Sequence, residues 1–351
     1  MRSDRNSSVG LCYLGPQGSF THQAAVEASV SLESSLGRQV DLVPCDRATR
    51  IVEAVESGGC WGIIAWESNV EGHVIPNMDA LIDSTNVAGF GRTSLPIVFD
   101  AFVRPDHGRL SSVSAHPHGL AQCRGFIRDV GLAEEAAPSN AAACRDLGQD
   151  QVALGPRLCG GLYGLQTYRS EVQDYQGART DFLLLAPREE VTGLARAMFG
   201  RSEVEGAKGA AANGETRDSD GAGEGPGSRP LREFESIIAF IPLHTGSGVL
   251  ADLLDRFRDA GLNMTSFMSR PIKGNDGTYS FIATIDAAPW EPALGGVMQD
   301  LLDQGDWIKT LAVYPRMERP DPPIPDWMLP RAGAWRERNL DKSGVDKELL
   351  W

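Results

Sequence analysis

The sequence predicts an α/β protein with two folded units that are joined by a linker. Short apolar runs alternate with Ala-rich helical stretches from about residue 10 to residue 187, which is typical of an α/β domain with largely parallel sheets. A Gly-rich, charged stretch without an apolar period follows. The segments after it are ordered strand, helix, strand, strand, helix, strand, which is the ferredoxin-like βαββαβ pattern.

The first unit contains several strand-like and helix-like segments. The expected strands are residues 11–15, 39–45, 60–66, 98–104, 111–116, 150–155 and 181–186, and the expected helices are residues 22–33, 47–58, 118–131 and 139–148. Ligands of such folds bind where strand ends meet helix starts, so we expect a pocket at these junctions.

The linker and the second unit are read from the change in composition. Glycine, alanine and charge dominate residues 206–230, which predicts a flexible linker at 189–232 between domains at 8–188 and 233–316. The second domain has expected strands at 236–243, 264–273, 278–287 and 307–316 and expected helices at 248–261 and 292–305. Several prolines and three tryptophans predict an irregular C-terminal tail at 317–351.

The composition predicts a cytoplasmic protein that handles small molecules. Its formal charge of −14 and isoelectric point near 4.9 argue against a nucleic-acid partner, which would need clustered Lys and Arg. No apolar run approaches the roughly 20 residues of a membrane span, and the first residues lack the apolar region of a signal peptide. Six scattered cysteines without a CxxC pair indicate free thiols in a reducing compartment and no metal site.

The first strand-to-helix junction, YLGPQGSF at Tyr13 to Phe20, raises a question of function. Two glycines and a hydroxyl group at such a junction fit a tight turn. They also fit a pocket floor, where backbone N–H groups and hydroxyls bind an anion.

Seven segments, in order along the chain, resemble the motifs of one enzyme family. They are GPQGSFTHQAA (15–25), GIIAWESNVEGHV (62–74), SAHPHGLAQC (114–123), SNAAAC (139–144), ALGPRLCGGLYGL (153–165), ARTDFLLLA (178–186) and GVLADLLDRFRDAGLNMTSFMSRP (248–271). Together they resemble the prephenate dehydratases that carry a C-terminal ACT regulatory domain.

The resemblance implies a fold, an activity and a mode of regulation. The first domain is expected to have two lobes, like a type II periplasmic binding protein, with the active site in the cleft. It is expected to dehydrate and decarboxylate prephenate to phenylpyruvate in phenylalanine biosynthesis, without a cofactor. The ACT domain is expected to bind phenylalanine between the subunits of a homodimer or homotetramer and to feed back on catalysis.

The resemblance also implies the residues of the active site. Thr180 stands at the family's donor position, and a threonine hydroxyl assists a leaving hydroxyl group by aligned donation. Glu67 and Asn69 are the other catalytic candidates. The substrate-binding candidates are Gly18, Ser19, Thr21, Ser68, His116, Ser139, Arg179, Asp181 and Phe182.

The match to the family breaks at several of these positions. The family's Glu-Asn-Ser is Glu67-Ser68-Asn69 here, with Ala65 and Trp66 before it, and Gly177 replaces an asparagine. The family's Thr-Arg-Phe is Thr180-Asp181-Phe182. If Asp181 faced a dicarboxylate substrate, two like charges about 5 Å apart would cost about 3 kcal/mol at an effective dielectric near 20.

Several explanations of the aspartate remain open. In the first explanation, Arg179 supplies the guanidinium that would bind the substrate, although neighbours on a strand point to opposite faces. Alternatively, the substrate is arogenate, whose ammonium suits Asp181, or the enzyme is a prephenate decarboxylase that keeps the ring hydroxyl. A non-catalytic amino-acid sensor is a further alternative. The positions of Asp181 and Trp66 relative to the cleft discriminate among these hypotheses.

The ACT-like segment supplies the allosteric candidates. Gly248, Val249 and Leu250 stand at a helix start, where backbone N–H groups can hold an amino acid's carboxylate. The other candidates are Asn263, Met264, Ser269 and Arg270. Met268 replaces the family's acid, so a domain that only dimerises is the alternative.

Overall fold

The computed structural model describes residues 8–199, 233–272, 274, 277–316, 324, 328–330, 332–334 and 342–350. Residues 1–316 form one compact unit and residues 317–351 form another. The described part of the second unit contains helix α11 (Lys342–Leu349). None of the described helices is both long and apolar enough to span a bilayer.

The first lobe is built on one end of a large sheet. Its strands are β1 (Val9–Leu14), β2 (Val40–Cys45), β3 (Cys60–Ser68), β4 (Gly72–His73), β5 (Val87–Pro96) and β11 (Arg179–Pro187). Its helices are α1 (Phe20–Leu36), α2 (Ala48–Glu56), α3 (Ile75–Asp83) and residues 188–199. The strand order is β5-β11-β3-β1-β2. Strand β1 is parallel to β2 and β3, whereas β11 is antiparallel to β3 and β5.

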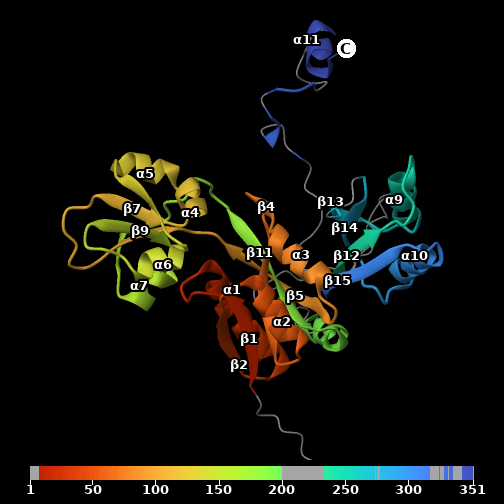
Figure 1. Cartoon of the computed structure of the whole chain (residues 1–351), viewed down its shortest axis with the longest axis horizontal. Coiled ribbons are helices and arrows are strands. Elements are labelled where there is room, and N and C mark those ends of the chain that lie inside the picture. The colour runs from red at the N-terminus through yellow and green to blue at the C-terminus, as the bar shows by residue number, and fades with distance from the viewer. Residues whose placement is uncertain are drawn as a thin grey trace, which may run out of the picture. The chain divides into compact units, whose positions relative to one another are not determined.

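The second lobe has its own sheet, around which helices α4 to α7 gather (Figure 1). Its strands are β6 (Asp100–Val103), β7 (Ser112–Ala115), β8 (Ala133–Ala136), β9 (Gln151–Gly155) and β10 (Gln166–Arg169), in the order β10-β6-β9-β7-β8. Its helices are α4 (Pro117–Gln122), α5 (Arg124–Val130), α6 (Asn140–Arg145) and α7 (Leu158–Tyr163). The chain crosses into this lobe after β5 and returns before β11, so the two lobes are joined by two crossing segments.

The βαββαβ segment extends the sheet of the first lobe. Its elements are β12 (Phe234–Ile241), α9 (Val249–Asp259), β13 (Met264–Pro271), β14 (Tyr279–Ile285), α10 (Pro292–Asp303) and β15 (Trp307–Pro315). The strand order is β13-β14-β12-β15, and β15 then lies beside β5, with Ala312 opposite Gly89. A Cβ atom on Gly89 would lie 2.7 Å from the Cβ of Ala312, so only glycine permits this approach.

The predicted α/β class and βαββαβ order are confirmed, although several elements were not predicted, among them α3, α7, β4, β8 and β10. The first lobe's sheet is mixed rather than largely parallel, because β11 returns antiparallel from the second lobe. Strand β5 was not predicted, because VAGFGRTSLP mixes glycines and polar residues. Residues 188–199 are helical where the linker was placed, with Val191 and Ala195 buried four residues apart. Helix α11 lies in the tail that was expected to be irregular.

The remainder of the predicted linker, residues 200–232, lies outside the described residues. The three tryptophans of the tail also lie outside them. The domain bounds therefore stay a prediction.

Candidate active site

A pocket of about 260 Å³ lies between the two lobes. Strands β3 and β11 and the start of α1 supply its wall from the first lobe, and α4 and α6 supply its wall from the second. Ile97 and Ala178, on the two crossing segments, also line it. Its volume is a little below the ~300–1,000 Å³ typical of ligand pockets, which suits a small substrate with one ring.

Strand β11 turns alternate side chains toward the pocket. Thr180 and Phe182 line it, whereas Asp181 between them does not. This follows from the two-residue period of a strand, which sends neighbouring side chains to opposite faces. The hydroxyl group that the sequence selected as a donor is therefore in the pocket, and the aspartate that reverses the family's charge is outside it.

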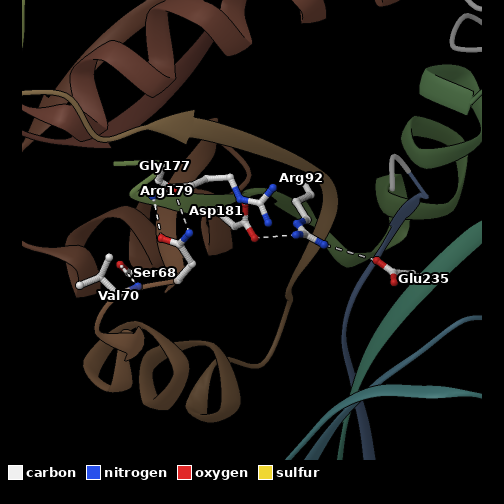
Figure 2. Close-up of polar contacts among 8 residues, drawn as sticks. Ser68, Val70, Arg92, Gly177, Arg179, Asp181 and Glu235 are labelled. Carbon is white, nitrogen blue, oxygen red and sulfur yellow. Dashed lines mark hydrogen bonds and ion pairs between the residues drawn. The ribbon is translucent and has the colours of Figure 1, made fainter. Parts of the chain in front are cut away.

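Asp181 forms an ion pair on the other face of the sheet. Its Oδ2 lies 2.5 Å from Nη2 of Arg92 on β5, and it is 7% exposed. Figure 2 shows Arg92 between Asp181 and Glu235, whose Oε2 lies 3.5 Å from Arg92 Nη1. Arg179 lies on the same side, with its Nε 3.9 Å from Asp181 Oδ1, so Arg179 does not line the pocket either.

Trp66 is packed in the core and does not fill the pocket. It is 5% exposed and belongs to a buried cluster with Met78 and Leu81. Asp181 pairs with Glu67 and Phe182 pairs with Ala65, so Trp66 is the extra residue of a β-bulge. The bulge brings Ala65 to the pocket wall and leaves the tryptophan on the core side.

The three polar residues at the end of β3 have different positions. Ser68 lines the pocket, and its hydroxyl accepts hydrogen bonds from the N–H groups of Val70 (3.2 Å) and Glu71 (3.4 Å). Glu67 is outside the lining, and its Oε1 lies 3.5 Å from Nε2 of His73.

Asn69 holds the backbone that leads into β11. Its Nδ2 donates to the carbonyl of Gly177 (2.9 Å), and its Oδ1 accepts from the N–H of Arg179 (2.8 Å). Both side-chain functions are used by backbone groups that lie three residues and one residue before Thr180. Asn69 therefore positions the strand instead of lining the pocket.

The YLGPQGSF junction is a capped turn. The N–H of Gly18 donates to Nδ1 of His22 (3.1 Å), and the N–H of Ser19 donates to the carbonyl of Pro16 (3.2 Å). The Ser19 hydroxyl caps α1 by accepting from the N–H of His22 (3.1 Å). Neither Gly18 nor Ser19 lines the pocket, and the N–H groups that were expected to hold an anion donate within the turn instead. Thr21 does line it.

The second lobe contributes imidazole and amide groups. His116 lines the pocket at the start of α4, and its Nδ1 accepts from the N–H of His118 (3.3 Å). Burial and the nearby His118 lower the pKa of His116, and the Glu71 carboxylate offsets part of this effect. A neutral His116 whose Nδ1 accepts carries its proton on Nε2, so it can donate to a ligand.

The residue that lines the pocket here is Asn140, next to Ser139, which the sequence selected. The Ser139 hydroxyl caps α6 by accepting from the N–H of Ala142 (3.0 Å) and does not line the pocket. Asn140 does line it, and its Oδ1 accepts from the N–H of His116 (2.9 Å). Asn140 stands in the same motif, so the motif located the site but not the residue.

A carboxylate bridges the two lobes at the pocket. Glu71, on the turn between β3 and β4, lies 3.2 Å from Nδ1 of His118 and accepts from Nε2 of Gln122 (2.7 Å). All three residues line the pocket, and none was selected from the sequence. His118 and Gln122 stand in the SAHPHGLAQC motif and Glu71 stands in GIIAWESNVEGHV, so the motifs were the available signal.

A second pocket, of about 470 Å³, lies in the βαββαβ segment. Val249 and Leu250 line it at the start of α9, together with Tyr279 and Phe281 of β14. Gly248 precedes the helix with φ of 92°, a conformation that glycine adopts readily. Gly248 and the other predicted allosteric residues, Asn263, Met264, Ser269 and Arg270, are not in its lining. Arg270 instead binds Asp79 of α3 (2.8 Å).

Comparison with known proteins identifies relatives over most of the chain. The family model described as prephenate dehydratase matches residues 11–190. A prephenate dehydratase of Amycolatopsis methanolica is 27% identical over 313 residues, which are 88% of this chain and 89% of the relative. One of Mycobacterium sp. (strain JLS) is 34% identical over 53% of this chain and 63% of the relative. The solved prephenate dehydratase of Arthrobacter aurescens in complex with L-Phe has a TM-score of 0.65 at 21% identity, and the match covers 88% of this chain and 90% of that one.

Proposed function

Because this chain belongs to the prephenate dehydratase family, we propose that the pocket between its lobes converts prephenate to phenylpyruvate in phenylalanine biosynthesis. The protein is then a carbon–oxygen lyase. The observation that carries the proposal is the alternation on β11, where Thr180 lines the pocket and Asp181 is turned away to Arg92. The charge reversal that the sequence suggested therefore does not act on the substrate.

In the proposed reaction, two bonds break and the ring becomes aromatic. The ring carbon–oxygen bond breaks as the hydroxyl takes up one proton, supplied by solvent, and leaves as water. The bond to the ring carboxylate breaks as well, and its electron pair enters the ring as carbon dioxide departs. Thr180 donates a hydrogen bond to the leaving oxygen, where negative charge develops.

The other lining residues bind the ring and the carboxylates. Phe20, Phe99 and Phe182 are apolar walls that exclude water from the ring. Thr21, Ser68, Gln122 and Asn140 supply neutral polar groups, and His116 supplies its Nε2–H. Among the described residues, the lining contains no Lys or Arg, so these donors have to hold the substrate's carboxylates.

The test compares Thr180→Val with Thr180→Ser in a prephenate assay. Valine keeps the shape of threonine but lacks the hydroxyl, and we expect kcat to fall by about 10²- to 10³-fold. Serine keeps the donor and should retain most of the activity. The product is identified by ultraviolet absorbance and mass spectrometry.

Each outcome of this assay identifies one function. Phenylpyruvate supports the proposal. A non-aromatic product that keeps the ring hydroxyl would indicate a prephenate decarboxylase. No turnover by the wild-type protein would indicate an amino-acid sensor. If Thr180→Val had the same kcat as Thr180→Ser, the hydroxyl of Thr180 would have no part in the reaction.

Arogenate is a second candidate substrate, because Glu71 is an acidic group in the lining. A carboxylate favours an ammonium group and repels the keto acid's charges. A higher kcat/KM for arogenate than for prephenate would support this candidate. Glu71→Gln should then reverse the preference.

The second pocket is proposed as the site of a phenylalanine effector. Its lining is largely apolar, and the N–H groups at the start of α9 can donate hydrogen bonds to a carboxylate. The L-Phe complex of the relative from Arthrobacter aurescens supports this choice of ligand. The predicted homodimer or homotetramer and the cytoplasmic location remain predictions.

A further inference from the structure

Four side chains form a row across neighbouring strands of the large sheet. Asp181 of β11, Arg92 of β5, Tyr314 of β15 and Glu235 of β12 lie on strands that are adjacent in the order β12-β15-β5-β11. Arg92 binds Asp181 at 2.5 Å and Glu235 at 3.5 Å (Figure 2). Its guanidinium carbon lies 5.9 Å from the centre of the Tyr314 ring.

The row is shielded from water. Asp181 and Glu235 are each 7% exposed, Tyr314 is 3% exposed, and the Arg92 side chain is 24% exposed. Burial disfavours the charge of Arg92, but Tyr314, Asp181 and Glu235 outweigh this effect and raise the pKa of the guanidinium. One cation thus serves two buried carboxylates, and its removal would leave both without their shared partner.

The row joins the βαββαβ segment to the strand that carries Thr180. Glu235 belongs to that segment, whereas Asp181 is the next residue after Thr180. Backbone pairing between the two parts of the sheet is narrow, since β15 and β5 pair through Ala312 and Gly89. The ion pairs of Arg92 therefore add side-chain contact where the backbone ladder is short.

We propose that Arg92 is a positioning residue, which ties β11 to the βαββαβ segment and thereby holds Thr180 at its place in the pocket. The aspartate at position 181 then serves as the partner of Arg92. The proposal is tested by kinetic measurements, which rest on the proposed function, and by structural measurements, which do not.

The kinetic arm uses Arg92→Gln, Arg92→Lys, Asp181→Asn and Glu235→Gln in the full chain. A displaced Thr180 lowers the rate of the chemical step more than it weakens binding. We expect Arg92→Gln and Asp181→Asn to lower kcat by about tenfold with KM within about twofold. Arg92→Lys should recover part of kcat, because an ammonium keeps the charge but lacks the planar fork that serves two carboxylates.

The structural arm measures hydrogen exchange of the β11 amides. Glu235→Gln changes a residue of the βαββαβ segment, and we expect the amides around Thr180 to exchange roughly five- to tenfold faster in it. Asp286→Asn is the matched control. Asp286 is also a buried acid of that segment and lies 3.6 Å from Arg316; it follows β14, which β12 and β15 separate from β5. It should leave the β11 amides unchanged.

The two arms separate the inference from the proposed function. Unchanged exchange of β11 in Glu235→Gln, or equal effects of Glu235→Gln and Asp286→Asn, would overturn the tie. Unchanged kcat in Asp181→Asn and Arg92→Lys would overturn the positioning role even if Arg92→Gln fails to fold. If the wild-type protein turns over no prephenate, the proposed function fails and the exchange of β11 still decides whether the tie exists.

Discussion

At the scale of single residues, the negative charge of Asp181 is balanced by an arginine on the neighbouring strand. Its carboxylate faces Arg92 across the β5–β11 pairing instead of the pocket. The position that carries arginine in the family thus carries the acid here, and β5 carries the base. The pair lies on the face of the sheet that is turned away from the pocket.

This arrangement predicts that restoring the family's arginine is harmful. Asp181→Arg would place a second guanidinium group beside that of Arg92. The two cations would then have only Glu235 as their shared partner in this row. Breaking a buried ion pair costs about 3–5 kcal/mol, and we expect a loss of about this size in the free energy of unfolding, measured with urea.

Two further variants make this result specific. Asp41→Arg changes an exposed aspartate of β2 and should alter the free energy by no more than about 0.5 kcal/mol. Combining Asp181→Arg with Arg92→Asp swaps the charges and should recover part of the loss. If the swap recovers nothing, the ion pair is not the cause.

His116 predicts a dependence of stability on pH. Its pKa in the folded protein is lowered from 6.5 by burial and by His118, so the unfolded chain binds this proton more readily. The stability that comes from neutral His116 is therefore complete above about pH 6.5 and is lost as the pH falls toward the lowered pKa. The free energy of unfolding should rise as the pH increases toward about 6.5 and then level off.

The variant His116→Asn isolates this contribution. Asparagine can cap α4 by accepting from the N–H of His118, but it does not titrate. The slope on the acid side should become smaller in the variant. It should not vanish, because burial also lowers the pKa of His22. An unchanged slope would show that His116 does not contribute.

At the scale of elements, two strands and one helix set the geometry of the proposed sites. The bulge in β3 turns Trp66 to the core and Ala65 to the pocket, and the side chain of Asn69 fixes the entry to β11. Helix α9 starts at the second pocket, where Val249 and Leu250 are part of the wall. Each proposed site therefore depends on where an element begins or is interrupted.

Helix α9 provides a test of the proposed effector. L-Phe at about 100 times its Kd should stabilise the wild-type chain by about 2.7 kcal/mol, measured as a shift in thermal unfolding. Leu250→Glu would place a carboxylate beside that of the effector and should abolish the shift. Leu254→Glu is the control, because Leu254 is an exposed residue of α9 outside the lining. A shift retained in Leu250→Glu would place L-Phe elsewhere.

At the scale of the compact unit 1–316, the pocket depends on contacts between the lobes. The turn before α1 docks on α7, where the Cys159 thiol donates to the carbonyl of Gly18 (3.2 Å) and the Tyr163 hydroxyl donates to that of Gln17 (2.5 Å). On the other side, Glu71 of the first lobe contacts His118 and Gln122 of the second. These contacts hold the lobes around a pocket that neither lobe forms alone.

The sequence by itself determined the class of the fold and the region of the pocket. Short apolar runs identified most strands, and the order βαββαβ followed from apolar runs that alternate with helix-like segments. Motifs around Thr180, Ser68 and His116 marked segments that meet at the pocket. These features could be read because they depend on residues close together in the chain.

Only the tertiary structure decided which polar groups face the pocket and which are already used. The donors of Gly18 and Ser19 are taken by His22 and by the backbone of the turn, which a motif cannot show. Arg92 lies 89 residues before Asp181 on a strand without a clear apolar period, so nothing local connects the two. The physical reason is that strand pairing and bulges set the direction of each side chain, and both arise from contacts between segments far apart in the sequence.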